Sequence, residues 1–92
     1  MLKGLLKEYE YYLKVTKGLS TNSISGYVTD LKEYVEFIIK NYAISDPGQI
    51  TKQHIRNFVA RLKRKKNTNS SISRKMSAIR SFHKYLILEK LV

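Results

Sequence analysis

Apolar residues recur at helical spacing along most of the chain, and four separate stripes can be followed. The first stripe predicts a helix from about Leu2 to Thr16, ended by Lys17 and Gly18. A polar cluster at residues 20–22 can cap a second helix, which continues to about Tyr42. No stretch alternates apolar and polar residues over the length of a strand, so the pattern predicts an all-α fold.

The second half of the chain continues the helical pattern after a turn. Asp46, Pro47 and Gly48 predict that turn, and Thr51 can cap a third helix. The basic and polar segment RLKRKKNTNSS then precedes a fourth helix, which is expected to start near Asn69 or Ser70. We predict a compact bundle of four helices that forms a single domain over residues 1–92.

The phases of the helices assign many side chains to core or solvent. The tyrosines expected in the core are Tyr9, Tyr27, Tyr34 and Tyr85. The acidic side chains expected on solvated helix faces are Glu8, Glu10, Asp30, Glu33 and Glu36. Gly26 lies inside the second helix, where glycine costs about 1 kcal/mol relative to alanine. Two interpretations remain open for it: close approach of an external group, or tight packing against another helix.

Positive charge is concentrated in the last third of the chain. The formal net charge is +11 in total, yet residues 1–30 and 31–60 contribute only +1 each. Residues 61–92 carry ten basic side chains and one acidic side chain, a net charge of +9. This asymmetry indicates a polyanionic partner, with nucleic acid favoured over an anionic membrane. The competing interpretation is a lysine-rich protein whose charge has no binding role.

Several function classes find little support in the sequence. The chain has no cysteine, and neither His54 nor His83 has a carboxylate at metal-ligand spacing, so we expect no metal and no cofactor. No phosphate-binding glycine loop or nucleophile-elbow motif occurs. No apolar run is long enough for a membrane span or a signal peptide. We therefore expect a soluble, cytoplasmic protein that is monomeric as an isolated domain and is not an enzyme by itself.

Two helices carry polar faces suited to DNA. Short hydroxylated side chains let a backbone approach DNA closely, and cations among them attract phosphates. On the second helix this face comprises Asn22, Ser25, Gly26, Thr29 and Lys32. On the fourth helix it comprises Ser70, Ser73, Arg74, Ser77, Ser81 and Lys84, with Lys75 and Arg80 at its margins.

Three ordered blocks of the sequence resemble a known family. They are KGLSTNSISGYVTDLKEYVEFI, ITKQHIRNFVARL and SSISRKMSAIRSFHKYLILEKLV. Together they resemble the N-terminal core-binding, SAM-like domain of tyrosine recombinases of the Xer and phage-integrase type. The resemblance implies binding of double-stranded DNA at a recombination site by the second and fourth helices. It also implies a catalytic domain in the same parent chain, expected after Val92.

The resemblance also implies individual contact residues. On the second helix these are Ser20, Thr21, Asn22, Ser25 and Thr29. On the fourth helix they are Ser71, Ser73, Arg74, Lys75, Ser77 and Arg80. Among them, Arg74 and Lys75 are expected to matter most, with Arg61 and residues 63–66 adding nonspecific attraction.

Two other functions are kept as alternatives. A stand-alone helix-turn-helix regulator would need two short helices joined by a tight turn, which the segment around Pro47 and Gly48 does not favour. A helical protein-interaction module would leave the positive charge incidental, and charge reversal at Arg74 and Lys75 would then not change DNA affinity.

Overall fold

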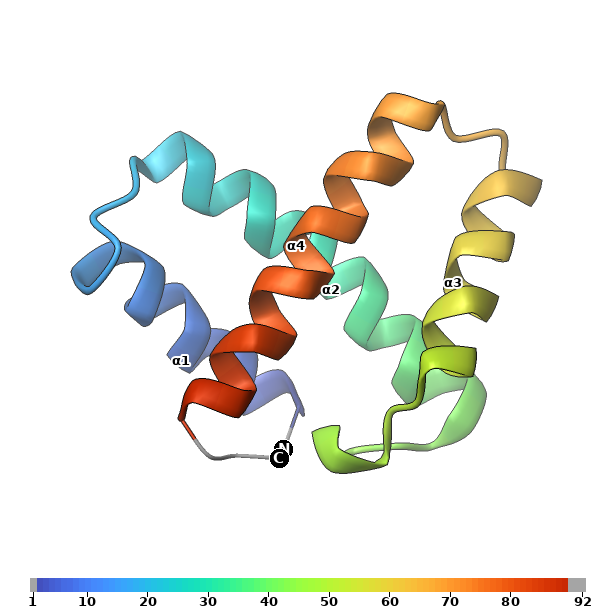
Figure 1. The fold of residues 1–92 in the computed structure, drawn as a ribbon, viewed down its shortest axis with the longest axis horizontal. Coiled ribbons are helices and arrows are strands. Elements are labelled where there is room, and N and C mark those ends of the chain that lie inside the picture. The colour runs from blue at the N-terminus through green and yellow to red at the C-terminus, as the bar shows by residue number, and fades with distance from the viewer. Residues whose placement is uncertain (1, 90–92) are drawn as a thin grey trace.

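The computed structural model describes residues 2–89, which form four α-helices and one short turn of 3₁₀-helix (Figure 1). The elements are α1 (Leu2–Val15), α2 (Thr21–Tyr42), η1 (Pro47–Gln49), α3 (Lys52–Arg64) and α4 (Asn69–Leu88). These residues contain no strand, so the predicted all-α fold is confirmed. Within the same range, no helix combines the length and the apolar character that crossing a membrane would require.

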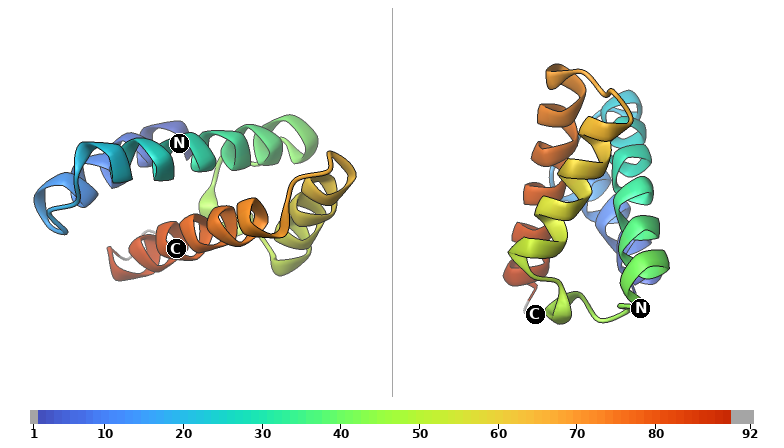
Figure 2. Two further views of the ribbon diagram at one scale, coloured as in Figure 1. Left: turned by 90° about the horizontal axis from the view of Figure 1, so that it is seen from above. Right: turned by 90° about the vertical axis from the view of Figure 1, so that its right-hand side faces the viewer.

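The helices are arranged around the crossing of α2 and α4. These two helices form an X in Figure 1, and their N-terminal halves lie on the same, upper side of the crossing. Seen from above, α1 and α2 lie in one layer and α4 lies in the other (Figure 2). Helix α3 packs against both α2 and α4. This arrangement brings the N-terminal halves of α2 and α4 to one edge of the molecule.

Side-chain caps explain where three of the helices begin. The Ser20 hydroxyl accepts from the backbone N–H of Ser23 at 3.2 Å and starts α2. The Thr51 hydroxyl caps α3, and the His54 ring nitrogen accepts from the Thr51 N–H at 3.0 Å. Thr68 caps α4. The predicted starts of the second, third and fourth helices are therefore confirmed.

Aromatic side chains from all four helices form the core. Tyr9, Tyr34, Phe58 and Phe82 are each at most 1% exposed. The Tyr9 and Phe82 rings meet edge to face at 5.3 Å, as do Tyr34 and Phe58 at 5.4 Å. Tyr85 is also buried, whereas Tyr27 is only partly buried. The tyrosine phases are thus confirmed, with Tyr27 at the edge of the core.

The connection between α2 and α3 spans residues 43–51 and contains η1. The Asp46 carboxylate accepts from the Gly48 N–H at 3.0 Å and caps η1, and Pro47 is buried. A helix-turn-helix motif needs a turn of about three to four residues. The longer connection does not provide that geometry between α2 and α3.

Candidate nucleic-acid interface

A groove separates the N-terminal halves of α2 and α4. It is lined by Asn22, Ser23, Gly26, Tyr27, Asp30, Arg74 and Ser77. Three of the predicted contact residues, Asn22, Arg74 and Ser77, therefore lie together although two different helices supply them. A Cβ atom placed on Gly26 would meet no neighbouring heavy atom within 4 Å. The helix-packing interpretation of Gly26 is therefore wrong, and its bare backbone faces open space in this groove.

The remaining predicted residues of α2 lie on the opposite flank of the helix. Thr21, Ser25, Thr29 and Lys32 line a second groove, between α1 and α2, together with Glu10 and Lys14. All four predicted residues are exposed. The structure consequently divides the predicted face of α2 into two parts. Lys14 was not predicted, and its position beside Lys32 depends on the packing of α1 on α2.

The outer face of α4 is exposed and contains no acid. Ser73, Ser77 and Arg80 are exposed, and no residue of α4 is acidic. Two of the predicted contact residues lie at the helix starts. The Ser20 hydroxyl caps α2, and Ser71 is half-buried with its N–H bonded to the Thr68 hydroxyl at 3.1 Å.

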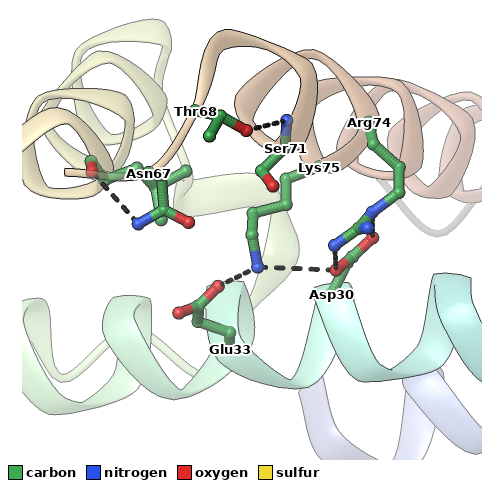
Figure 3. A network of polar contacts seen from close by, with 8 residues as sticks. Asp30, Glu33, Asn67, Thr68, Ser71, Arg74 and Lys75 are labelled. Atoms are coloured by element: carbon green, nitrogen blue, oxygen red, sulfur yellow. Dashed lines mark hydrogen bonds and ion pairs between the residues drawn. The ribbon is translucent and has the colours of Figure 1, made fainter. Parts of the chain in front are cut away.

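Asp30 departs from its predicted environment. Its side chain is 4% exposed, and its two carboxylate oxygens accept from Arg74 Nε at 3.0 Å and from Arg74 Nη2 at 3.1 Å (Figure 3). The prediction of a solvated Asp30 is therefore wrong. The physical reason is its helical phase, because Asp30 lies one turn from both Tyr27 and Tyr34 and shares their inward side. That spacing was the sequence signal for its burial.

Lys75 also points inward. Its side chain is 12% exposed, and its Nζ atom lies 2.6 Å from Glu33 Oε1 and 3.5 Å from Asp30 Oδ1 (Figure 3). The sequence placed Lys75 at the margin of the polar face, whereas the structure directs it toward α2. It falls four and seven residues before Ile79 and Phe82, which are buried. Its ammonium thus joins two helices and is largely withdrawn from the surface.

Asp30, Glu33, Arg74 and Lys75 form one polar cluster, which we call the α2–α4 charge cluster. It contains the only ion pairs within 4.0 Å among residues 2–89. Two carboxylates and two cations give this cluster no net charge. The exposed cations Lys32 on α2 and Arg80 on α4 have no carboxylate within 4.0 Å among the described residues, so their charge faces solvent.

The basic segment of residues 63–66, which comprises the end of α3 and the start of its connection to α4, lies beside the N-terminus of α4 (Figure 1). Residues 63–66 are all basic and exposed. Lys66 has a left-handed backbone with φ of 60°, and the Asn67 amide donates to the Leu62 carbonyl at 3.1 Å (Figure 3). The basic segment is therefore turned back against the end of α3 at the same edge as the predicted interface.

The two histidines have structural partners. His83 Nε2 lies 2.8 Å from the Tyr34 hydroxyl, and burial lowers the pKa of His83 while raising the pKa of Tyr34. His54 belongs to the α3 capping box. Among residues 2–89, no group of three or more His, Asp or Glu side chains is arranged to hold a metal ion.

The family described as phage integrase, N-terminal SAM-like domain, matches residues 6–90. Tyrosine recombinase XerD of Halalkalibacterium halodurans is 36% identical over 86 residues, which cover 94% of this chain and 29% of the relative. The XerD of Oceanobacillus iheyensis is 32% identical over 99% of this chain and 31% of the relative. The XerD of Staphylococcus aureus strain N315 is 35% identical over 97% of this chain and 30% of the relative. No solved structure matches the chain.

These matches define the class of the molecule as a helical domain of the recombinase type. The chain belongs to the phage-integrase N-terminal SAM-like domain family. It spans about a third of the length of the curated XerD relatives that it matches. The family resemblance predicted from the three sequence blocks is thereby confirmed.

Proposed function

We propose that this chain binds double-stranded DNA in a sequence-directed manner through the N-terminal halves of α2 and α4. The observation that carries the proposal is the character of that exposed surface. Short hydroxylated side chains are exposed on both halves, and Asp30, the only acid in either half, is buried. The exposed cations Lys32 and Arg80, which have no ion-pair partner among the described residues, follow directly after these halves. Short side chains permit close approach to the double helix, and the helix N-termini favour phosphate.

We infer further that residues 1–92 act as a single core-binding domain of a site-specific tyrosine recombinase. In this proposal the domain positions a catalytic domain of the same parent on the recombination site and supplies no catalytic group itself. Burial of three of the seven tyrosines, Tyr9, Tyr34 and Tyr85, supports that division for these three, whereas Tyr11 is 68% exposed. Burial raises the pKa of Tyr9 and Tyr85, which disfavours the phenolate that a nucleophile needs.

A titration of fluorescently labelled duplex DNA tests the binding proposal. Anisotropy measured with the 92-residue chain should rise at low salt, and log K should fall linearly with log salt because counterions are released. If no binding occurs at low salt, or if affinity does not depend on salt, DNA binding is refuted.

A pair of matched variants locates the surface. Lys32→Gln combined with Arg80→Gln should flatten the salt dependence by roughly two units, about one for each lost phosphate contact. Lys52→Gln combined with Arg56→Gln removes the same charge from exposed positions at the start of α3, which is the far end of the molecule in Figure 1. The control should change the slope much less. Equal effects of the two pairs would show that only net charge matters.

The inference about catalysis has a separate test. A nicked duplex that traps covalent recombinase–DNA adducts should give no adduct with this chain, even at DNA concentrations that saturate binding. An adduct that persists in denaturing gels, and that disappears on replacing one tyrosine with phenylalanine, would contradict the inference.

A further inference from the structure

Asp30 holds the Arg74 guanidinium along one edge only. Arg74 Nε and Nη2 donate to Asp30 Oδ2 and Oδ1, and within residues 2–89 they have no other acceptor. A guanidinium carries five N–H donors in a single plane. This side-on pairing therefore leaves one N–H of Nη2 and both of Nη1, so the end of the group still presents two parallel donors. The Arg74 side chain is 61% exposed, which makes that end accessible.

The anchor of this arginine is rigid. Asp30 is buried on α2, and a second cation, Lys75, stabilises its carboxylate from the other side. An unrestrained arginine loses side-chain entropy when it is fixed in one orientation. Asp30 already fixes much of that orientation in the unbound protein. Such preorganisation benefits a contact that depends on direction far more than one that depends on charge alone.

The net charge of the α2–α4 charge cluster also favours a directional contact of Arg74 over one that depends on charge alone. Nonspecific affinity for DNA comes from net positive charge through counterion release. Because Asp30 and Glu33 neutralise Arg74 and Lys75, the cluster adds almost nothing to that attraction. Its remaining contribution is the fixed pair of N–H donors at the end of Arg74.

We propose that Arg74 reads a guanine in duplex DNA and that Asp30 is the residue that positions it. The end of a guanidinium matches the O6 and N7 acceptors that guanine presents in the major groove. Arg74 lines the groove beside Asn22, Gly26 and Ser77, where the absence of a side chain on Gly26 leaves room for the edge of a base. This inference rests on the proposed function of DNA binding. It assigns Arg80 and Lys32 to phosphates and gives Lys75 no contact with DNA.

The test begins with a selection. The 92-residue chain is used to select bound duplexes from a pool randomised over one turn of the double helix, and the bound fraction is sequenced. Affinity is then measured at several salt concentrations for the selected duplex and for a duplex in which one G·C pair is exchanged. We expect the wild-type chain to prefer the selected G·C pair by roughly ten- to a hundredfold.

Arg74→Lys should abolish this preference while changing the salt slope by less than one unit, because lysine cannot make the bidentate contact. Arg56→Lys, at an exposed position of α3 outside the proposed surface, is the matched control and should retain the preference. Circular dichroism confirms that each variant is folded, and the exposure of both side chains makes unfolding unexpected.

A second pair of variants tests the positioning role of Asp30. Asp30→Asn and Glu33→Gln each remove one negative charge, so both should steepen the salt slope by about one unit and tighten nonspecific binding. Only Asp30→Asn should lose the preference for guanine, because Glu33 contacts Lys75 and not Arg74. A merely structural role of Asp30 would weaken specific and nonspecific binding together.

Three results would overturn the inference while leaving DNA binding intact. The first is DNA binding by the wild-type chain without any selected base pair. The second is Arg74→Lys retaining the preference, which would make Arg74 a phosphate contact. The third is identical behaviour of Asp30→Asn and Glu33→Gln. A wild-type chain that binds no DNA at low salt would instead refute the proposed function itself.

Discussion

The two halves of α4 are attached to the molecule by contrasting contacts. In the C-terminal half, Phe82 and Tyr85 pack against α1, with ring centroids 5.3 Å from Tyr9 and 4.8 Å from Tyr12 respectively. In the N-terminal half, Arg74 and Lys75 reach carboxylates of α2. Aromatic packing buries the whole side chain, whereas an ion pair can bind one edge of a polar group and leave the other edge exposed. One helix thus combines a part that stabilises with a part that presents donors.

The largest effect on stability is expected from a substitution in the C-terminal half of α4, where the aromatic contacts lie. Phe82→Ala should reduce the free energy of unfolding by about 3–5 kcal/mol, because a fully buried ring is replaced by a cavity. Urea denaturation followed by circular dichroism measures the change. Phe82→Leu is the control and should cost much less. A loss below about 1 kcal/mol for Phe82→Ala would show that the aromatic contacts do not hold α4.

A smaller loss of stability is expected when the carboxylates that contact the N-terminal half of α4 are removed. Asp30→Ala should cost about 2 kcal/mol, since it removes charge-assisted hydrogen bonds and leaves the Lys75 ammonium with Glu33 as its only remaining partner in the charge cluster. Glu33→Ala should cost less than about 1 kcal/mol because the Glu33 side chain is 37% exposed. Denaturation curves of both variants provide the comparison. Equal losses of unfolding free energy in the two variants would mean that the burial of Asp30 does not increase its contribution to stability.

Gly26→Ala should affect stability and DNA binding in opposite directions. It should stabilise the chain by up to about 1 kcal/mol, because alanine favours the helix and the new Cβ meets no neighbour. The same variant should weaken binding of duplex DNA, since the methyl group narrows the groove beside Arg74. Thermal unfolding and anisotropy titration measure the two effects. Unchanged DNA affinity would place Gly26 outside the contact surface.

The smallest expected effect is a pH dependence located in the aromatic half. Burial lowers the pKa of His83, so the folded protein disfavours the protonated ring. The contribution of His83 to stability is therefore complete above about pH 6.5 and is lost as the pH falls toward its lowered pKa. His83→Gln should remove this part of the acid dependence when unfolding is measured between neutral and acidic pH. Identical profiles for the two proteins would contradict it.

The helices were predictable because their signals are local. Ser20 and Thr51 lie where caps were expected, and the apolar stripes place the buried faces correctly. Exposed members of the candidate site, such as Ser77 and Arg80, follow from the phase of α4 alone. Each of these predictions depends only on the sequence within one helix.

The polar cluster was not predictable in the same way. Arg74 and Asp30 are 44 residues apart, and their pairing depends on where α2 and α4 cross. Asp30 was predicted on a solvated face although it shares the helical phase of Tyr27 and Tyr34, and no local pattern named its partner. Likewise, the division of the α2 residues between two grooves depends on α1 and α4 flanking the helix.

An amide-shift map of the isotope-labelled chain with duplex DNA locates the DNA-binding surface residue by residue. Binding through the N-terminal halves of α2 and α4 predicts the largest shifts in residues 21–32 and 70–80, with smaller shifts in the basic segment 63–66. Tyr11 and Ile87, which are exposed on α1 and at the end of α4, should not shift. Shifts confined to α3 or to the C-terminal half of α4 would contradict binding through the N-terminal halves of α2 and α4.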